Sequence, residues 1–545
     1  MNAAPMGTPA SGTHTDPAID VARGVVAELA GEITDAVVCP GSRNTPLVMA
    51  LMAREDIRVH VRIDERAAAF LALGLARAQR RHVAVCMTSG TAVANCLPAL
   101  VEACQSHTPL VVLSADRPQR LHGTGASQTI TQNGLFAAYV ETLQVDAAAA
   151  ATDPERGVRA WLRAHPQAHI NVALDQPLVP DAPLGRVAAP RTTAPRPVNA
   201  FVDHGEVAVD LSLDTVVIAG DEAWEVPGLE EVPTIAEPSA PAPLNPVHPL
   251  AADQLHPQQV IVVGHPTLDR RVMALAAGQT MPPGGEVIVL SRTEQLTDPQ
   301  RAASRVGSRV AVTGAVRRGW LRRCEDTSQR AAETVRDVLR DPEMGITGLH
   351  VAAAVADTLA EGDAVFAAAS NPVRDLSWVG LPLGGNPTFT PRGAAGIDGT
   401  ISQAIGVALA RDAESPDLPT APRTIALVGD LAFLHDCGGL LIGPAERRPE
   451  NLTIVVANDD GGGIFAGLEI GDPVHSDVFE RAVATPHGAR LGQLCAGFGV
   501  EHSRVDNLED LVSALMDAHQ HPRFHVLEVA TTRASRRRLG QAVRP

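Results

Sequence analysis

Lysine is absent from the 545 residues of this chain, so all 45 basic residues are arginines. A protein without lysine has no ε-amine for Schiff-base chemistry, and it lacks the lysine that P-loop nucleotide hydrolysis requires. Anions must therefore be bound by arginine side chains, which match carboxylates and phosphates, or by backbone N–H groups.

Aromatic residues are also scarce, at 3%, and the formal net charge is −17. Nucleic acids are bound by basic surfaces, often with stacking aromatics, so we expect no nucleic-acid partner. No apolar run approaches the ~20 residues that a membrane helix needs, which predicts no membrane span. The first 20 residues lack the basic and apolar regions of a signal peptide, so we expect a cytoplasmic protein.

Cysteine is infrequent, and the seven cysteines include no CxxC pair. An odd number without a pattern indicates a reducing compartment and no disulfide framework. Cys86, Cys96 and Cys104 lie in apolar segments and are predicted to be small buried residues. His165 and His169 are four residues apart, but no acidic ligand accompanies them, so no zinc site is predicted there.

Short β-rich runs alternate with alanine-rich helical stretches in three blocks of the chain. They include HVAVCMTSG and PLVVLSAD in the first block, and RTIALVGD and NLTIVVAND in the last. This alternation is typical of βαβ units and predicts an α/β protein with three doubly wound parallel-sheet domains. We expect a disordered tail at 1–16, a first domain at 17–187, a linker at 188–202, a central domain at 203–340 and a third domain at 341–545. Within the central domain, the proline-rich stretch 231–250 predicts a loop.

Two acidic residues follow predicted strands of the third domain. Asp430 comes directly after IALVG, and Asp459 comes 29 residues later, after LTIVVAN and before a run of glycines. The spacing fits one βαβ crossover, and adjacent parallel strands lie ~4.8 Å apart, so the two carboxylates are placed to share a cation. Oxygen ligands beside a glycine-rich loop favour Mg²⁺ bound to a diphosphate. Each half alone is also an ordinary turn sequence.

Glu65 begins a predicted helix whose following residues are almost all apolar. Asp64 is placed to cap this helix and Glu65 falls in its first turn, so both are also explained as capping carboxylates. Because the helix is predicted to be buried, Glu65 is expected to be partly desolvated. Desolvation raises the pKa of a carboxyl group and suits it to proton transfer.

Arginines recur on turns at the carboxyl ends of predicted strands. Arg43 lies beside Ser42 in the turn between the strand ITDAVV and the next helix, which is a place to hold an anion. Arg117, Arg374 and Arg392 occupy comparable positions. One loop arginine is usually a surface residue, but four of them predict a site for ligands with several carboxylates.

Two further segments give weaker signals. MTSGTAVAN, at 87–95, is a strand followed by a small-residue turn and a helix. It permits the close approach of a flat ligand, and a helix start without a ligand explains it equally well. RASRRRL, at 533–539, predicts a basic helix whose arginines face solvent.

Several of these residues together resemble a known superfamily. Asp430 followed by NDDGGG resembles the diphosphate and metal motif of thiamine diphosphate enzymes, and Glu65 resembles their cofactor-activating glutamate. The layout of the chain is similar to their pyrimidine-binding, central and diphosphate-binding domains. A closer resemblance, to the synthase branch of menaquinone biosynthesis, rests on CPGSRNTPL, DERAAAFLALGLA, TSGTAVAN, ADRP followed by Gln128, SNPVRD, RGAAGIDG and NDDGGGIF.

The resemblance implies a reaction and its cofactors. Enzymes of this branch use thiamine diphosphate with Mg²⁺, or Mn²⁺ as an alternative, to decarboxylate 2-oxoglutarate and add the succinyl unit to isochorismate. The cofactor supplies the electron sink, and the protein binds, orients and provides charge. In this superfamily the counterparts of Glu65 and Asp430 come from different subunits. The resemblance therefore implies a homodimer or homotetramer with active sites at the subunit interface.

The resemblance also implies a role for each matching residue. Glu65 would hydrogen-bond to the aminopyrimidine ring, and Ile397 would hold the cofactor bent. The expected cofactor contacts are Ser89, Gly90, Thr91, Asn371, Ile397, Gly429, Asp430, Leu431 and Gly461, with Asp430, Asp459 and the Gly461 carbonyl on the metal. Ser370 and Arg374 would hold the distal carboxylate of the succinyl group. Isochorismate would contact Ser42, Arg43, Arg117, Gln128 and Arg392, with Ile464 and Phe465 as apolar walls.

Two positions depart from the superfamily pattern, and two alternatives compete with the main interpretation. Leu431 replaces a glycine, and Asp459 replaces the second residue of an Asn-Asn pair, which adds a negative charge near the phosphates. The family's basic residue from the central domain has two candidates, Arg270 and Arg309. Another decarboxylase or carboligase of the acetolactate synthase type is the first alternative, although it acts on monocarboxylates. A relative that has lost catalysis is the second, and retention of Glu65 argues against it.

Overall fold

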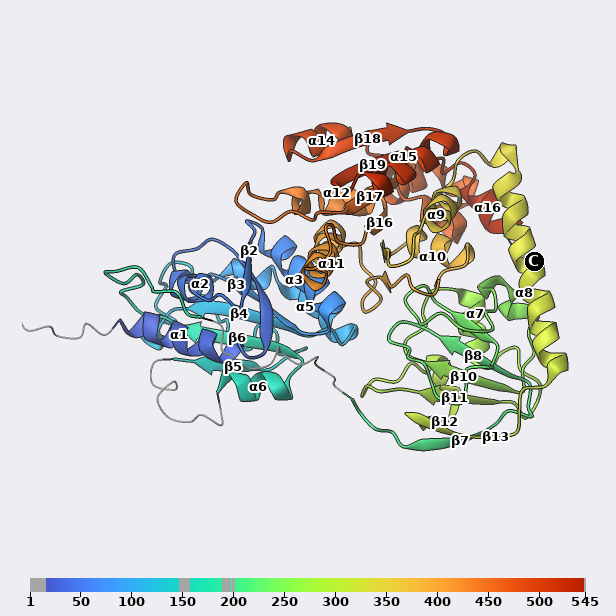
Figure 1. Ribbon diagram of the computed structural model, residues 1–545, viewed down its shortest axis with the longest axis horizontal. Coiled ribbons are helices and arrows are strands. Elements are labelled where there is room, and N and C mark those ends of the chain that lie inside the picture. Colours follow the sequence, from blue (N-terminus) through green and yellow to red (C-terminus); the bar gives the residue numbers. More distant parts are fainter. Residues whose placement is uncertain (1–15, 147–156, 189–197, 199–200, 544–545) are drawn as a thin grey trace, which may run out of the picture.

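Three α/β units make up the computed structural model, which describes residues 16–146, 157–188, 198 and 201–543 (Figure 1). The predicted tail at 1–16 and linker at 188–202 therefore lie largely outside the described residues. Every strand pairing in the three main sheets is parallel. The predicted fold class, an α/β protein with parallel-sheet domains, is confirmed.

The first unit is a six-stranded sheet with the strand order β2-β1-β3-β4-β6-β5. Its central strands β3 and β4 are buried along their whole length, which explains why they read as continuous apolar runs. The strands are β1 (Ile33–Val38), β2 (Arg58–Val61), β3 (His82–Met87), β4 (Leu110–Asp116), β5 (Thr142–Val145) and β6 (Gln167–Ala173). The helices are α1 (Pro17–Leu29), α2 (Thr45–Met52), α3 (Glu65–Gln79), α4 (Thr91–Ala94), α5 (Leu97–Gln105) and α6 (Val158–Ala164).

The third unit repeats this topology, with the strand order β15-β14-β16-β17-β19-β18. Numbered within its own unit, each sheet follows the order second, first, third, fourth, sixth, fifth. The strands are β14 (Ala364–Ala367), β15 (Thr388–Phe389), β16 (Thr424–Gly429), β17 (Leu452–Asn458), β18 (Glu501–Val505) and β19 (Phe524–Ala530). Its helices include α9 (Gly348–Asp357), α10 (Asn371–Trp378), α11 (Thr400–Glu414), α12 (Asp430–His435), α14 (Leu491–Gly497), α15 (Leu508–Gln520) and α16 (Arg536–Ala542).

The first and third units contact each other through α3 and α11, which lie side by side between the two sheets (Figure 1). Two glycines allow this close approach. A Cβ on Gly74 would overlap the backbone of Gln403, and a Cβ on Gly406 would overlap the carbonyl oxygen of Leu71. The buried side chains of both helices belong to one continuous hydrophobic core, so the two units are held together as one body.

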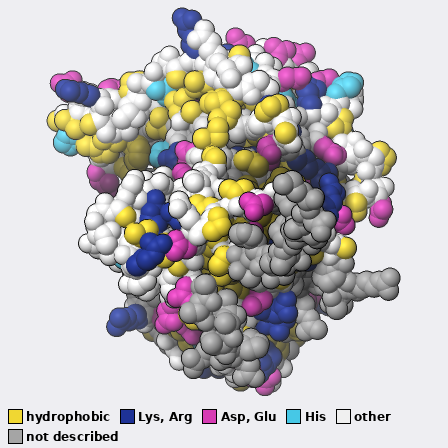
Figure 2. All heavy atoms as spheres, turned by 90° about the vertical axis from the view of Figure 1, so that its left-hand side faces the viewer, with side chains coloured by type: hydrophobic (Ala, Val, Ile, Leu, Met, Phe, Trp, Pro, Cys, Tyr) yellow, Lys and Arg dark blue, Asp and Glu magenta, His cyan; other side chains and the backbone are white. Residues whose placement is uncertain are grey.

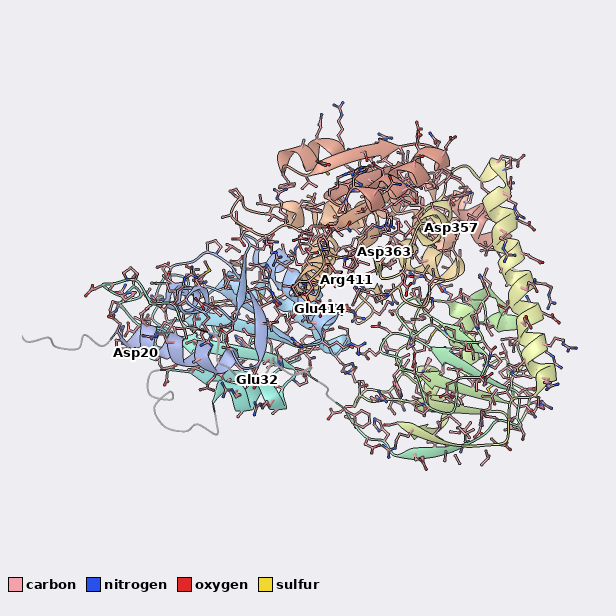
Figure 3. All side chains as sticks on the ribbon, viewed as in Figure 1. Asp20, Glu32, Asp357, Asp363, Arg411 and Glu414 are labelled. Atoms are coloured by element: carbon pink, nitrogen blue, oxygen red, sulfur yellow. The ribbon has the colours of Figure 1, made fainter. Side chains whose placement is uncertain are left out.

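The C-terminal end of α11 carries charged side chains, whereas the helix from Thr400 to Ala410 is uncharged and buried. Arg411 and Glu414 project from this end (Figure 3), and Arg411 donates to the carbonyl oxygen of Gly362. Nearby, the buried guanidinium of Arg423 pairs with Asp363 at 2.8 Å. The Arg423 guanidinium is fully paired, as a buried charge must be, whereas the buried Nε of Arg411 has no partner among the described residues. Both arginines lie at the opposite end of α11 from the glycine-rich turn that precedes it.

The central unit is a five-stranded sheet in the order β12-β11-β10-β8-β9, with β7 and β13 paired separately. A long helix, α8 (Arg318–Arg340), runs from this unit along the edge of the molecule toward the third unit (Figure 1). The strands are β7 (Glu206–Asp210), β8 (Thr215–Ala219), β9 (Thr234–Ala236), β10 (Gln259–Val263), β11 (Glu286–Leu290), β12 (Ala303–Gly307) and β13 (Arg309–Thr313), and α7 spans Arg270–Ala276.

Several edge strands were not predicted. β9 lies inside the proline-rich stretch 231–250, which was wrongly predicted to be only a loop. β15 has two residues, and β18 is largely exposed. β9 and β15, with three and two residues, are too short to give a periodic hydrophobic pattern, and β18 is too exposed to give a continuous apolar run. No helix among the described residues has both the length and the apolar character needed to cross a lipid bilayer.

Candidate active site

A cavity of about 130 Å³ opens at the carboxyl ends of β14, β16 and β17, where parallel sheets bind ligands. We call it the C-terminal cavity, because all of its lining residues lie between Thr347 and Arg536. The predicted site residues that line it are Ser370, Asn371, Ile397, Gly429, Asp430, Leu431, Asp459, Gly461, Ile464 and Phe465. The structure thus brings together the predicted metal ligands and the predicted diphosphate contacts.

Asp430 links the two loops that bound this cavity. Its Oδ1 accepts a hydrogen bond from the backbone N–H of Leu431 at 2.6 Å, and its Oδ2 accepts one from Gly461 at 2.9 Å. His487 Nε2 lies 3.3 Å from the same Oδ2. Gly461 has a φ of +145° and a Cβ there would overlap the carbonyl oxygen of Ala484, so only glycine fits at this turn.

Asp459 lies on the neighbouring loop, where burial and the charge of Asp430 raise its pKa to about 7. Two carboxylates held this close in a desolvated site repel each other, and a divalent cation between them relieves the repulsion. In the described part of the chain, no group of three or more His, Cys, Asp or Glu side chains is arranged to hold a metal. The residues present fit a hard cation that takes its other ligands from backbone carbonyls, water and a diphosphate.

Ile397 reaches the cavity from a loop that a glutamate of the first unit holds in place. The carboxylate of Glu102, on α5, accepts hydrogen bonds from the backbone N–H groups of Gly393 at 2.8 Å, Ala394 at 2.6 Å and Ala395 at 3.2 Å. Burial raises the pKa of Glu102, and the hydrogen bonds from Gly393 and Ala394 oppose that effect. Glu102 was not predicted as a site residue, because nothing in its helix distinguishes it from other glutamates.

A second group of predicted residues gathers at the carboxyl ends of β1, β3 and β4, and we call it the N-terminal cluster: Arg43, Ser89, Gly90, Arg117 and Gln128. Arg117 donates to the Ser89 hydroxyl and, at 2.9 Å, to the Gln128 carbonyl oxygen. Gln128 Nε2 donates back to the Ser89 carbonyl oxygen at 2.9 Å. Arg43 donates to the carbonyl oxygen of Leu174 at 2.8 Å, and burial, followed by the charge of Arg117, lowers its pKa.

Ser42, Thr91 and Glu65 border the N-terminal cluster without joining its hydrogen bonds. Ser42 and Thr91 are exposed, Thr91 at the first position of α4. Glu65 is half-buried at the start of α3, and Asp64 caps that helix as predicted, accepting from Arg66 at 2.8 Å and Ala67 at 3.2 Å. Within the described residues the Glu65 side chain makes no hydrogen bond or ion pair. Neither it nor the N-terminal cluster lines the C-terminal cavity.

Arg374 and Arg392 lie between the third and central units. Arg374 Nη1 donates to the Ser370 carbonyl oxygen at 2.6 Å, and the side chain lines a separate cavity of about 370 Å³ together with Arg270. Arg392 is 4% exposed and donates twice to the Thr267 hydroxyl, at 2.5 and 3.1 Å. Arg309, the other central-domain candidate, instead pairs with Asp203 at 2.9 Å.

Arg536 is a residue of the C-terminal cavity that was not predicted. It is the first residue of α16, and its guanidinium lines the cavity and pairs with the buried Asp375. The prediction that the run RASRRRL faces solvent is therefore wrong for Arg536. It describes Arg537 and Arg538 better, since their side chains are 44% and 51% exposed. No local pattern separates these three consecutive arginines.

The cysteines take no part in either site. Cys86 and Cys96 are buried as predicted, and burial raises the pKa of Cys86 to about 12. Cys104 is only half-buried, which corrects the prediction for that residue. All seven cysteines are free thiols.

Comparison with known proteins defines the class. A family model described as thiamine pyrophosphate enzyme, N-terminal TPP binding domain, matches residues 19–135, and one described as thiamine pyrophosphate enzyme, C-terminal TPP binding domain, matches 384–529. The solved structure of a Rhodococcus jostii RHA1 thiamine diphosphate-dependent 4-hydroxybenzoylformate decarboxylase superimposes with a TM-score of 0.62. It covers 94% of this chain and 99% of its own, and at 17% identity it supports the fold alone. Fold and domain matches together define a thiamine diphosphate-dependent enzyme.

Curated relatives narrow the class to one family. The 2-succinyl-5-enolpyruvyl-6-hydroxy-3-cyclohexene-1-carboxylate synthase of Corynebacterium glutamicum (strain R) is 55% identical over 97% of this chain and 98% of its own. The synthases of the same name from Corynebacterium diphtheriae and Mycolicibacterium smegmatis are 53% and 44% identical, over 96% and 97% of this chain and 99% of each relative. The chain belongs to this synthase family of menaquinone biosynthesis, whose members form a carbon–carbon bond with decarboxylation. The predicted resemblance is confirmed over the acetolactate synthase alternative.

Proposed function

We propose that this protein decarboxylates 2-oxoglutarate and adds the succinyl unit to isochorismate, giving 2-succinyl-5-enolpyruvyl-6-hydroxy-3-cyclohexene-1-carboxylate and CO₂. The names of the relatives support this reaction. The observation that carries it is the pairing of a carboxylate-lined cavity, suited to a metal diphosphate, with arginines at the strand ends. Each proposed substrate has two carboxylates, and arginine is the residue best suited to hold them.

We assign the diphosphate of thiamine diphosphate to the C-terminal cavity. Mg²⁺, or Mn²⁺ in its place, would be held by Asp430, Asp459 and the Gly461 carbonyl. The backbone around Gly429 and Leu431, together with Asn371, would hold the phosphates, and Ile397 would support the thiazolium ring from below. When bound, thiamine diphosphate supplies the electron sink for decarboxylation of a 2-oxo acid.

Glu65 is the residue we assign to proton exchange with the aminopyrimidine ring of the cofactor. Its side chain has no partner among the described residues, which leaves both carboxylate oxygens free to accept a hydrogen bond. Ser89, Gly90 and Thr91 would contact the same ring. Gly90 has a φ of +83°, and a Cβ there would meet the Gln128 side chain at 2.9 Å, so this turn keeps its backbone open to a flat ligand.

A second copy of the chain would complete the site. All residues lining the C-terminal cavity come from the third unit, whereas Glu65 lies on the first. Ile63, two residues before Glu65, is 67% exposed, so it offers apolar surface that a second copy could cover. Figure 2 shows further hydrophobic side chains gathered on the face that includes the first unit. We propose a homodimer, or a tetramer of two such dimers, that buries this surface.

The arginines divide between the two substrates. Ser370 and Arg374 would hold the distal carboxylate of 2-oxoglutarate, and Arg270 is the central-unit residue placed to assist, because it lines the same cavity as Arg374. Isochorismate would be held by the remaining polar residues and by two apolar side chains, which are Ser42, Arg43, Arg117, Gln128, Arg392, Ile464 and Phe465. We also propose a cytoplasmic location, which the seven free thiols favour.

A product assay tests the proposed reaction. Purified protein with thiamine diphosphate, Mg²⁺, 2-oxoglutarate and isochorismate is expected to release CO₂ and form the cyclohexene product, identified by mass spectrometry. Omission of isochorismate or of either cofactor should abolish the product. Equal turnover with pyruvate in place of 2-oxoglutarate would contradict the assignment and would favour an acetolactate-type reaction.

A further inference from the structure

The C-terminal segment of the chain closes one side of the C-terminal cavity. Thr531 and Thr532, which follow β19, and Arg536 of α16 all line it. Arg536 is 12% exposed, far less than its neighbours Arg537 and Arg538. A buried arginine is costly unless it is paired, so its inward orientation needs a structural or functional reason.

Arg536 connects two residues of α10 that lie 165 and 161 positions earlier in the chain. Its Nη1 lies 3.0 Å from one oxygen of Asp375 and 3.3 Å from the other. Its Nη2 donates to Asn371 Oδ1 at 2.7 Å. Asp375 is 1% exposed, so its buried carboxylate holds the Arg536 guanidinium in place. The guanidinium in turn holds the side-chain amide of Asn371.

This arrangement determines which atoms Asn371 presents to the cavity. The Oδ1 is the only hydrogen-bond acceptor of the amide, and Arg536 occupies it. In the described part of the chain, Nδ2 makes no hydrogen bond to protein, and Asn371 lines the cavity. The two N–H donors of the amide are therefore available to an anion, and a rotation that would present the oxygen instead would break the bond to Arg536.

The charge of the cavity wall gives a second reason for Arg536. Asp459 places a carboxylate where the superfamily has asparagine, so this cavity carries one more negative charge than usual close to the diphosphate. Arg536 and Arg533 are the cations that act on Asp459 electrostatically. Both guanidiniums are themselves paired, Arg533 with Glu480 at 2.8 Å and Arg536 with Asp375 at 3.0 Å, but of the two only Arg536 lines the cavity.

We propose that Arg536 is a positioning residue for the cofactor diphosphate, acting through Asn371. The relay Asp375–Arg536–Asn371 aims the amide N–H donors of Asn371 at the phosphates, and it places a guanidinium in the cavity wall that also carries Asp459. The proposal rests on the assignment of the C-terminal cavity to the diphosphate, and it explains why a single arginine of the run 536–538 turns inward.

Binding of thiamine diphosphate to the apoprotein, measured by titration calorimetry at saturating Mg²⁺, tests the proposal without reference to activity. Arg536→Gln is expected to raise the Kd about tenfold or more, since it removes the charge-assisted hydrogen bond that orients the Asn371 amide. Thiamine, which lacks phosphates, should bind the variant and the wild type equally. Arg537→Gln and Arg538→Gln are matched controls on the same turn and should change the Kd less than twofold.

A double-mutant cycle tests whether Arg536 acts through Asn371. In an Asn371→Ala background, Arg536→Gln should raise the Kd less than threefold, because the amide it positions is gone. A full tenfold effect in that background, an equal loss of thiamine binding, or an equal effect of Arg537→Gln would overturn the proposal.

Two further variants keep the result interpretable. Loss of Arg536 leaves Asp375 buried without a partner, so Arg536→Gln combined with Asp375→Asn removes both charges and carries the test if the single variant does not fold. Asp430→Asn tests the cavity assignment itself. If Asp430→Asn leaves Mg²⁺-dependent cofactor binding unchanged, the assignment fails. If it weakens binding while Arg536→Gln does not, the relay alone fails.

Discussion

The first and third units have the same strand order but present opposite chemistry at equivalent strand ends. After their third and fourth strands, the first unit presents Ser89 and Arg117, whereas the third presents Asp430 and Asp459. In the first unit, which we call the arginine side, Arg117 donates to the hydroxyl oxygen of Ser89 and to the carbonyl oxygen of Gln128. In the third unit, which we call the carboxylate side, Asp430 accepts hydrogen bonds from the backbone N–H groups of Leu431 and Gly461.

This difference shows how one topology serves two ligands. Paired carboxylates with tight glycine turns suit a cation and its diphosphate, whereas arginines with a free N–H suit organic carboxylates held directly. If Glu65 activates the cofactor as proposed, neither unit is sufficient, because Glu65 lies on the arginine side and the C-terminal cavity lies on the carboxylate side. The account therefore requires both chemistries to meet in one active site.

Among the substitutions considered, removal of the Glu65 carboxylate, which we propose activates the cofactor, is expected to have the largest effect on activity. Glu65→Gln should lower kcat by roughly 10² to 10⁴, the range that a positioned proton-transfer group contributes. The Kd for thiamine diphosphate with Mg²⁺ should change little, because the carboxylate side is intact. Asp64→Asn is the control, since asparagine also caps helices, and it should retain activity within threefold. Wild-type kcat in Glu65→Gln would show that the first unit does not activate the cofactor.

Substitution of an arginine in the third unit and of one in the first unit should raise the KM for different substrates. Arg374→Ala is expected to raise the KM for 2-oxoglutarate roughly 10- to 100-fold, and Arg43→Ala should do the same for isochorismate. Steady-state kinetics with each substrate varied in turn measures both values. An Arg374→Ala effect confined to isochorismate would reverse the proposed division.

Addition of a single methyl group at the contact between the first and third units should destabilise the protein. Gly74→Ala is expected to destabilise the protein by roughly 2 kcal/mol, because its Cβ would overlap the backbone of Gln403 across the α3–α11 contact. Gly24 lies in α1, and a Cβ added there would have no neighbour within 4 Å, so Gly24→Ala should be neutral or slightly stabilising. Thermal unfolding of the apoprotein compares them, and equal stability of the two variants would contradict the close contact.

The smallest expected effect is a pH dependence on the carboxylate side. The pKa of Asp459 is raised to about 7 in the folded apoprotein from an ordinary 3.8, so the folded state binds more protons between these values. Apoprotein stability should therefore fall as pH rises from about 4 to 7. Asp459→Asn should make this fall shallower without removing it, because burial also raises the pKa of Glu237 to about 7. Excess Mg²⁺ should have the same effect on the wild type. An unchanged profile in Asp459→Asn would indicate that another group is responsible.

Local sequence patterns correctly predicted the features that depend on residues close together in the chain. The buried strands and the pair Asp430 and Asp459 follow from apolar runs and from a spacing of one crossover. Arg536 and Glu102 could not be predicted, because their partners lie 165 and 291 positions away in the chain. Their roles depend on how the units pack. The edge strands were missed for a different reason, since β9 and β15 are too short to show a period and β18 is too exposed to show an apolar run.

Subunit complementation tests the central claim most directly. Glu65→Gln and Asp430→Ala are each expected to be inactive, and coexpression with different affinity tags allows the mixed dimers to be isolated. If each active site joins the first unit of one copy to the third unit of the other, a mixed dimer contains one intact site and one with both substitutions. The account predicts that purified mixed dimers regain about half of the wild-type activity per dimer. Mixed dimers as inactive as their parents would contradict it.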